Sequence, residues 1–466
     1  MFVRKPLNVM LSFALVAMAG AAHAAVPYTT SPLPVGDAQE MTSPYVLAPG
    51  WTQTVIANKT NQNALVLGSN SGNWDMIDSN RTGADANRYL FMPFETGTGG
   101  VQRVDLWDTN YNTRTVTIVA PGTQGFVSGD ASRWTPWGTY LTAEESWSDP
   151  ASPTSSKGRL FEVTNPTTAT ANGGIFEQRK IGPADIRVSH EGLAFDKANN
   201  FYFIDERNDS HIFKFTSSNP NATNGADFFG AGQTSVLRVG DGTTQEATGA
   251  YTWVALTDAN GAALPGTIVK TDPNGMTILD GRATPNEAAF LGTNFDRPED
   301  LEIQDLANGD QRLYVATTTN HNVFALDLAN SEIDLFVSRD TIDGETNDVV
   351  GSVFSSPDNI AIGPDGTMYI IEDQNGGVEN IWRTVDADKD GIAESMSVFA
   401  TLRTANAEST GMYFVGDKIY VNVQHPLSGN DVLVEISPVP EAETYAMMLA
   451  GLGLVGFAAA RRKSVK

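Results

Sequence analysis

Cysteine is absent from the 466 residues, and histidine occurs only five times. A chain without thiols can form no disulfide and can use no thiolate as a nucleophile or metal ligand. The five histidines are scattered and too few for a histidine-ligated metal centre. Stability must therefore come from a large packed core, from bound metal, or from both.

Basic residues are also scarce, with 30 Lys and Arg against 55 Asp and Glu, giving a formal net charge of −25. Such a balance argues against nucleic acid or an anionic membrane as a partner. It suits divalent cations, which carboxylate oxygens bind well. For most of these acids the simpler explanation is that a charged surface keeps the protein soluble.

Long apolar runs occur at the two ends of the chain. Near the start, Arg4 and Lys5 precede the uncharged run 7–19, and Ala22-His23-Ala24 supplies small residues for signal peptidase. This order predicts a signal helix within a signal peptide, residues 1–24, cleaved after Ala24. The alternative is an N-terminal anchor, but the run is short for crossing a bilayer.

At the other end, a Pro-Val-Pro-Glu turn at 438–441 leads into the apolar stretch 445–460 and then Arg461-Arg462-Lys463. Positive residues resist translocation, so this order predicts a membrane helix whose C-terminus stays in the cytoplasm. Residues 438–466 resemble the PEP-CTERM sorting signal. The resemblance implies removal by an exosortase-type enzyme and a secreted or cell-surface location, whereas the alternative is a permanent membrane anchor.

Between the two ends, helical periodicity is scarce and turn residues separate short runs rich in Val, Ile, Phe and Tyr, which predicts an all-β fold. Four segments repeat one pattern of acid, apolar strand, turn and second strand. They are residues 191–206, 299–317, 358–373 and 408–423. Repeated hairpins of this kind are typical of propeller blades.

We therefore predict a six-bladed β-propeller over residues 25–437, with 217–295 as a long inserted region. One acid per blade would face the central axis. The candidates are Glu95, Glu144, Glu191, Glu299, Asp358 and Glu408. Converging carboxylates repel one another unless cations neutralise them, and hard oxygen ligands favour Ca²⁺, Mg²⁺ or Fe³⁺. Alternatively, these acids cap strands or pair with Arg133, Arg187 and Arg297.

A separate calcium-type motif lies further along the chain. Asp386, Asp388 and Asp390 alternate with other residues before Gly391, as in calcium loops, and Glu394 is positioned to close a short loop. This pattern predicts a structural calcium turn between two strands. The alternative is an acidic surface hairpin.

Over residues 45–435 the chain resembles the PhoX-type alkaline phosphatases, secreted six-bladed propellers that use calcium and iron. The resemblance is carried by 135–142 followed by Glu144-Glu145, by His190-Glu191-Gly192, Arg297-Pro298-Glu299 and Ser356-Pro357-Asp358, and by 421–426. It implies that Glu144, Glu191, Glu299, Asp358 and Glu408 are metal ligands or their neighbours, and Glu95 fits more loosely.

Two positions depart from the family pattern. Ala143 stands where the family has a cysteine iron ligand, so the resemblance implies Ca²⁺ and leaves Fe³⁺ doubtful. Asp300 follows Glu299 where many members have Trp, which adds another acid. Glu144, Glu299 and His425 are the candidates for direct catalytic roles.

The expected function is metal-dependent hydrolysis of small phosphate monoesters outside the cell by a monomer. Two alternatives stay open on the same scaffold. One is a non-catalytic calcium-bound propeller that binds matrix polysaccharide, and the other is a calcium-dependent lactonase-type hydrolase.

Overall fold

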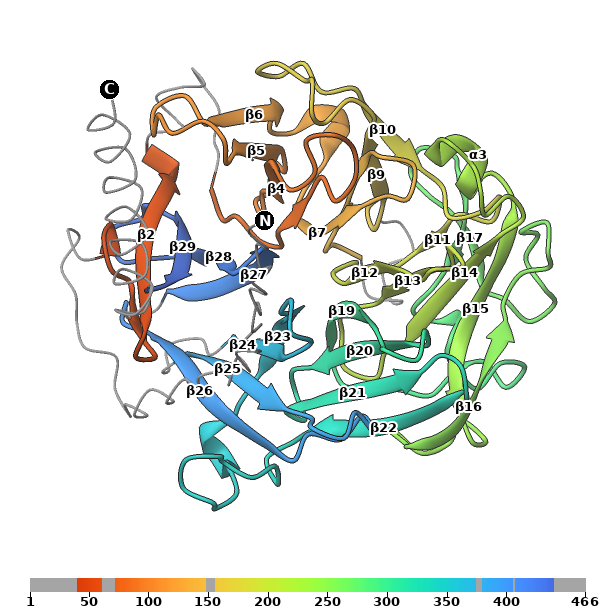
Figure 1. The fold of residues 1–466 in the computed structure, drawn as a ribbon. Coiled ribbons are helices and arrows are strands. Elements are labelled where there is room, and N and C mark those ends of the chain that lie inside the picture. The colour runs from red at the N-terminus through yellow and green to blue at the C-terminus, as the bar shows by residue number, and fades with distance from the viewer. Residues whose placement is uncertain (1–39, 61–71, 148–155, 374–378, 405–406, 440–466) are drawn as a thin grey trace, which may run out of the picture.

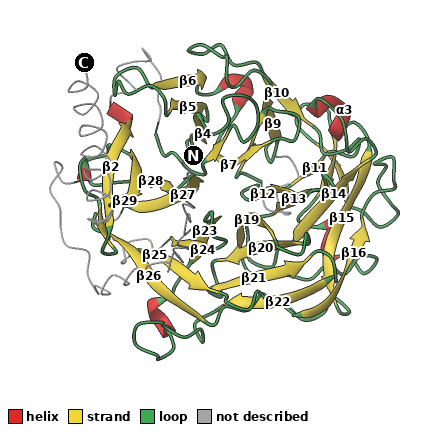
Figure 2. Cartoon of the chain, viewed as in Figure 1, coloured by secondary structure: helices red, strands yellow, loops and turns green. Residues whose placement is uncertain are grey.

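The computed structural model describes residues 40–60, 72–147, 156–373, 379–404 and 407–439. Groups of antiparallel strands surround a central axis, so the predicted all-β class is confirmed (Figure 1). Within the described ranges, helix is confined to short pieces such as α3 (Gly225–Phe229), and loops join most strands (Figure 2).

The described residues form six groups, which we call blades 1 to 6 in chain order. Blade 1 contains β3 (Asp78–Ser79), β4 (Tyr89–Pro93), β5 (Val101–Asp105) and β6 (Thr115–Val119). Blade 2 contains β7 (Gly129–Trp134), β8 (Tyr140–Glu144), β9 (Leu160–Val163) and β10 (Phe176–Arg179). Blade 3 contains β12 (Leu193–Phe195), β13 (Phe201–Ile204), β14 (Ile212–Ser217) and β15 (Gly232–Val239).

Blade 4 contains β19 (Pro298–Asp305), β20 (Gln311–Thr317), β21 (Asn322–Asp327) and β22 (Glu332–Val337). Blade 5 contains β23 (Pro357–Ile362), β24 (Met368–Glu372), β25 (Asn380–Val385) and β26 (Ser395–Leu402). Blade 6 contains β27 (Glu408–Val415), β28 (Lys418–Gln424), β29 (Val432–Pro438) and β2 (Trp51–Asn58). Each blade begins with its innermost strand (Figure 1).

The ring is closed by strands from opposite ends of the chain. In blade 6, β2 pairs antiparallel with β29, with Val55 opposite Val434. In blade 5, β1 (Tyr45–Leu47) pairs with the outer edge of β26. Closure of this kind leaves few free strand edges and holds the first and last blades together without a disulfide.

Residues 217–295 include strands that belong to a blade and strands that do not. Among them, β15 completes blade 3, while β16 (Gly249–Ala255) pairs with β15 and also with β22 of blade 4. A small sheet is formed by β11 (Ile186–Arg187), β17 (Val269–Thr271) and β18 (Thr277–Asp280). The domain boundaries and the inserted region stay predictions.

The core is divided among the contacts between neighbouring blades. Phe91 of blade 1 packs against Trp134 and Tyr140 of blade 2. Ile56 and Leu433 of blade 6 pack with Leu90 of blade 1. Because strands here are covered on both faces, β7 and β8 are buried along their whole length. Inter-blade packing therefore supplies the apolar burial that a cysteine-free chain needs.

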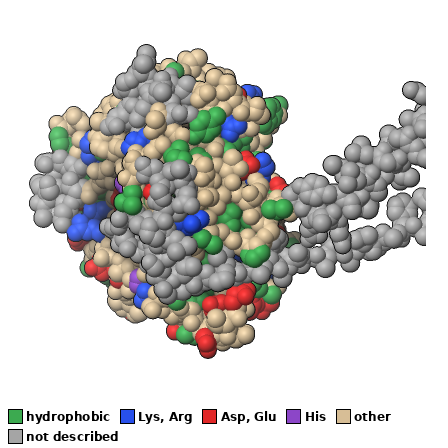
Figure 3. Space-filling view, turned by 90° about the vertical axis from the view of Figure 1, so that its left-hand side faces the viewer, with side chains coloured by type: hydrophobic (Ala, Val, Ile, Leu, Met, Phe, Trp, Pro, Cys, Tyr) green, Lys and Arg blue, Asp and Glu red, His purple; other side chains and the backbone are tan. Residues whose placement is uncertain are grey.

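Both terminal segments predicted from the sequence, the signal peptide and residues 440–466 of the sorting tail, lie outside the described residues. Across the part of the chain that the structure does describe, no helix combines the length and apolarity needed to cross a bilayer. In the view of Figure 3, acidic side chains gather toward the lower edge of the described surface, and basic side chains are scattered over the rest of it.

Candidate metal centre

The start of every innermost strand carries an acid, and we call these six residues the first ring. They are Asp75, Asp130, Glu191, Glu299, Asp358 and Glu408. All six side chains line one hollow at the centre of the propeller. Five of them are buried.

Backbone irregularities aim these side chains. The residue two positions before the acid has a left-handed backbone at Asn73, Ser128, Arg297 and Ser356. In blades 2, 4 and 5 the register with the second strand also shifts across the acid, as in a β-bulge. Bulges re-aim side chains, and strained backbone of this kind concentrates at functional sites.

A second ring follows the second strand of each blade. Its members are Glu95, Glu145, Glu206, Thr318, Asp373 and His425. In blades 1 to 5 the backbone N–H of the second-ring residue donates to the carbonyl two residues before the first-ring acid, at distances of 2.8–3.0 Å. This repeated hydrogen bond fixes each second-ring residue beside the acid of the same blade.

Together the rings form what we call the acidic hub. It has a volume of 60 Å³ and is lined by ten carboxylates and one guanidinium, that of Arg297. Oxygens of Glu191, Glu206 and Glu299 lie within 4.8 Å of one another. Gly192 allows this approach, because a Cβ there would lie 2.4 Å from the backbone nitrogen of Leu301 in the next blade.

Among the described residues that line the hub, Arg297 is the one with a positive charge. Its Nε donates to Glu206 at 2.7 Å and lies 3.1 Å from Glu299 Oε1, while Nη1 is 4.0 Å from Asp373. The side chain is 39% exposed. One guanidinium cannot balance ten carboxylates, so a large negative charge is left.

This excess of negative charge, together with burial, changes the pKa values of the hub acids. Burial raises the pKa values of the first-ring acids, and nearby carboxylates raise most of them further. The pKa of Asp358 rises to about 7, chiefly through burial. Burial raises the pKa of Glu145 well above its usual range, and the carboxyl of Glu206 beside it adds to the effect. The hub therefore favours bound protons or bound cations.

The residues present fit a hard divalent cation. The donors are carboxylate oxygens, which Ca²⁺ and Mg²⁺ prefer. Asp130 Oδ1 is buried and has no hydrogen-bond partner among the described residues, as expected of an oxygen that serves a ligand. Ala143, where the resemblance places a cysteine in the family, lies fully buried in the apolar cluster with Leu141 and Leu160, so its methyl group offers no donor.

The structure brings Glu95, Glu191, Glu299, Asp358 and Glu408 together in the hub, as the sequence predicts. His425 lies at its edge, with Nε2 3.8 Å from Glu408 Oε2 and 47% of the side chain exposed. Asp300 does not join the hub, since its Oδ2 accepts the backbone N–H of Ile360 in blade 5. Asp300 thus links two innermost strands.

Glu144 is not brought to the hub, which corrects its predicted placement. Its side chain is fully buried against Arg159, with Oε2 2.9 Å from Nε and Oε1 2.6 Å from Nη2. Side chains alternate along a strand, so Glu145 is the residue that faces the hub. Asp205 and Glu372 occupy the same place in blades 3 and 5 and likewise bind neighbouring groups of the scaffold.

Sequence reasoning also missed Asp75, Asp130, Glu206 and Asp373. The signal for the last two was present, because acidic pairs recur after the second strand. They are Glu144-Glu145, Asp205-Glu206 and Glu372-Asp373. In each pair the first acid binds the scaffold and the second faces the hub.

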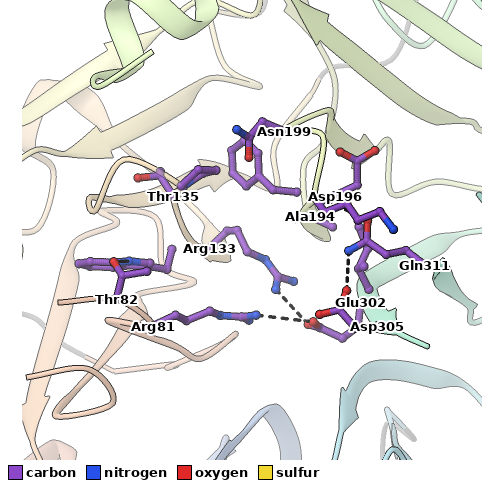
Figure 4. A pocket seen from close by; sticks show the side chains of 15 residues that line it. Arg81, Thr82, Arg133, Thr135, Ala194, Asp196, Asn199, Glu302, Asp305 and Gln311 are labelled. Atoms are coloured by element: carbon purple, nitrogen blue, oxygen red, sulfur yellow. Dashed lines mark hydrogen bonds and ion pairs between the residues drawn. The ribbon is translucent and has the colours of Figure 1, made fainter. Parts of the chain in front are cut away.

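The other ends of the innermost strands surround a different cavity, of 310 Å³. Here Arg133 donates to Glu302 at 3.0 Å, and Arg81 lies 3.8 Å from the same carboxylate (Figure 4). Acids and bases therefore neutralise one another in this cavity. The uncompensated acidic hub is the better candidate for a cation site.

A closed ring of β-blades around buried, converging carboxylates defines a propeller protein whose central cavity could hold a metal ion. The family model of alkaline phosphatase PhoX matches residues 131–427, and the PEP-CTERM protein-sorting motif matches residues 438–463. The chain belongs to the alkaline phosphatase PhoX family, whose members are phosphatases. The tail indicates an exported protein processed by an exosortase-type enzyme.

One solved structure supports the fold, and a second is more distantly similar. Pseudomonas fluorescens PhoX, in complex with the transition-state analogue vanadate, is 16% identical with a TM-score of 0.56, and the match covers 88% of this chain and 98% of that one. A Bacteroides thetaiotaomicron protein of unknown function is 12% identical over 83% of this chain and 76% of its own, with a TM-score of 0.44. Among curated proteins, no sequence matches.

The two members of the Glu144-Glu145 pair should respond differently to removal of charge. We expect Glu145→Gln to reduce bound metal while leaving the free energy of unfolding unchanged or raised, because it relieves repulsion. Glu144→Gln should cost roughly 3–5 kcal/mol of stability, because it leaves Arg159 buried and unpaired, with metal content retained. Urea denaturation and elemental analysis of both variants would measure this. The reverse pattern would place Glu144 in the hub after all.

Stability of the metal-free protein should fall as the pH rises. The six first-ring acids have pKa values above those of the unfolded chain. The folded state therefore binds more protons and loses stability from about pH 4 upward, by about 1.4 kcal/mol per pH unit for each such group until its folded pKa is passed. For Asp358 that limit is about 7. Chelator-treated protein should therefore unfold at lower urea concentration at pH 8 than at pH 5, and added Ca²⁺ should restore it. Equal midpoints in chelator would contradict the repulsion argument.

Proposed function

We propose that the acidic hub binds Ca²⁺ and that the protein uses this centre to hydrolyse phosphate monoesters outside the cell. The observation that carries the proposal is the buried excess of carboxylates over the single guanidinium in the hub. A phosphate dianion would be repelled from that cavity unless bound cations reversed its charge. We therefore infer that more than one divalent ion is needed for substrate binding.

Bound Ca²⁺ would supply Lewis-acid coordination of the phosphoryl oxygens and would activate an oxygen nucleophile. The residues proposed to hold the ions are Glu145, Glu191, Glu206, Glu299 and Asp358. Thr318 donates a hydrogen bond to Glu299, which fixes the orientation of that carboxylate. Ala143 leaves no thiolate at the family position, so we favour calcium over iron.

Arg297 is the residue of this chain best placed to contact the substrate directly. Its Nε is held by Glu206, so the guanidinium is oriented before substrate arrives. The side chain is partly exposed, so its Nη atoms can donate to phosphoryl oxygens in the fork geometry that arginine offers. Orientation of this kind lowers the barrier without any covalent role for the side chain.

His425 is proposed as the proton donor to the leaving group. Its backbone is left-handed, with φ 54°, and its ring lies at the edge of the hub beside Glu408. A proton on the imidazole would pass to the ester oxygen as the P–O bond breaks, so that the leaving group departs as an alcohol. Glu408 would hold the protonated ring in place.

Purified protein should hydrolyse a nitrophenyl phosphate, lose this activity in a calcium chelator, and recover it with Ca²⁺. Glu299→Gln should lower kcat roughly 10²–10³-fold, because it removes one negative ligand from the centre of the hub. Asp417→Asn, in an exposed turn between β27 and β28, is the charge-matched control and should be fully active. A metal-loaded protein that is inert toward phosphate monoesters but cleaves lactones or binds polysaccharide would sink the proposal.

The proton-donor role can be tested by changing the leaving group. A nitrophenolate leaves without a proton, whereas an alkoxide needs one. We expect His425→Gln to slow hydrolysis of an alkyl phosphate roughly 10²-fold while changing the nitrophenyl ester little. Equal losses on both substrates would indicate instead that His425 only positions the substrate or Glu408.

A further inference from the structure

A second group of acids lies in the turn of the β25–β26 hairpin, on the outer half of blade 5 (Figure 1). We call residues 386–394 the hairpin loop. Oxygens of Asp386, Asp388 and Glu394 lie within 4.8 Å of one another. Ca²⁺ binds oxygen at about 2.3–2.6 Å, so ligands on opposite sides of one ion can be about 5 Å apart. The spacing of these three oxygens therefore suits a single ion.

Asp386 supplies an independent sign of a ligand. The residue is only 7% exposed, and its Oδ1 has no hydrogen-bond partner among the described residues. Its other oxygen, Oδ2, is 3.6 Å from Arg312 Nη1. Buried carboxylate oxygens are normally satisfied by a donor, water or a metal. One oxygen of Asp386 is thus free to bind a cation.

Arg312 does not take the place of that cation. It comes from β20 in blade 4, and its Nη2 donates to the carbonyl of Lys389 at 3.1 Å, so it holds the loop backbone. Gly391 permits this contact, because a Cβ there would lie 2.9 Å from Arg312 Cζ. The loop still carries four carboxylates against Lys389 and this guanidinium.

The convergence of the carboxylate oxygens separates the three ligands from Asp390. Hydrogen bonding does not, because Asp388 also accepts a backbone N–H within the turn, that of Asp390 at 3.2 Å. Glu394 reaches back across the loop and accepts the backbone N–H of Ala387 at 2.8 Å. Asp390, which the sequence pattern includes among the ligands, instead accepts the N–H of Ile392 at 2.8 Å and is not one of the three converging acids. Asp390 therefore shapes the turn.

We propose that the hairpin loop binds one Ca²⁺ through Asp386, Asp388 and Glu394, independently of the acidic hub, and that this ion fixes the outer hairpin of blade 5 against blade 4. The ion would neutralise the acids beside Arg312 and hold the loop in the conformation that Arg312 binds. With three carboxylates on an exposed turn, the affinity should resemble that of extracellular calcium modules, with Kd on the order of 10⁻⁴–10⁻³ M.

The test uses the purified full-length chain, stripped of metal and titrated with CaCl₂ while bound calcium and thermal unfolding are followed. We expect Asp388→Asn to bind one Ca²⁺ fewer per chain near about 1 mM free Ca²⁺ and to lose part of the calcium-dependent rise in Tm. Phosphatase turnover at saturating calcium should be retained. Asp388 is exposed, so the variant should fold.

Controls separate the two sites. Asp417→Asn removes one exposed charge elsewhere and should keep the full stoichiometry and Tm shift. Glu299→Gln should lose activity yet retain the calcium ion that Asp388→Asn loses. Equal calcium stoichiometry and an equal Tm shift in Asp388→Asn and the unaltered protein would overturn the proposal. If Asp388→Asn gave an ambiguous loss, Glu394→Gln should reproduce it, and failure to do so would also count against the site.

Discussion

Repulsion among the buried carboxylates of the acidic hub is the constraint on which the rest of the structure depends. Ten acids line a hollow of 60 Å³ that contains one guanidinium. Desolvation and like charge both oppose ionisation there, as the raised pKa values of Asp75, Glu191 and Glu408 show. A flexible scaffold would relieve this repulsion by moving apart. Packing of the surrounding scaffold must therefore keep the acids close together until a counter-ion or a proton is bound.

The propeller keeps the acids in place by repeating one local geometry in its blades. Each blade presents residues from the same two places, an acid at the start of the innermost strand and a second-ring residue at the end of the second strand. In five blades one backbone hydrogen bond holds the two together. Left-handed residues and bulges turn the side chains toward the axis. Apolar clusters between blades, with ring closure by β2 and β29, resist expansion of the ring. Strain at the centre is thus offset by burial at the periphery.

Sequence alone predicted the parts of this design that repeat in composition. Glu191, Glu299, Asp358 and Glu408 were found because each opens a hairpin with a regular apolar pattern. Asp75 and Asp130 occupy the same place, but β3 has only two paired residues and β7 reads Gly-Asp-Ala-Ser-Arg-Trp, so neither resembles an apolar strand. Because their residues are mostly polar or small, these two buried strands can be identified only from the pairing and packing in the structure.

Register explains the errors that remain. Glu144 and Glu145 are identical in type, and only the pairing of β8 with its neighbours decides which one meets Arg159 and which one meets the hub. Asp300 likewise follows Glu299 directly yet bonds to blade 5. Glu95 was selected by analogy with acids that open innermost strands, although it closes a second strand. Glu95 nevertheless lies in the hub, because both rings converge on the same hollow.

The two acidic groups differ in what a cation would do for them. In the hub, the first-ring acids of all six blades and the second-ring acids of four blades share one cavity, so a bound ion would act on the whole ring and on any anionic ligand that enters. In the hairpin loop, the three acids come from nine consecutive residues, and the contact with Arg312 joins only blades 4 and 5. A cation there would act on one inter-blade contact. Because the chain has no cysteine, a calcium ion in the hairpin loop would supply the kind of local cross-link that disulfides give other exported proteins.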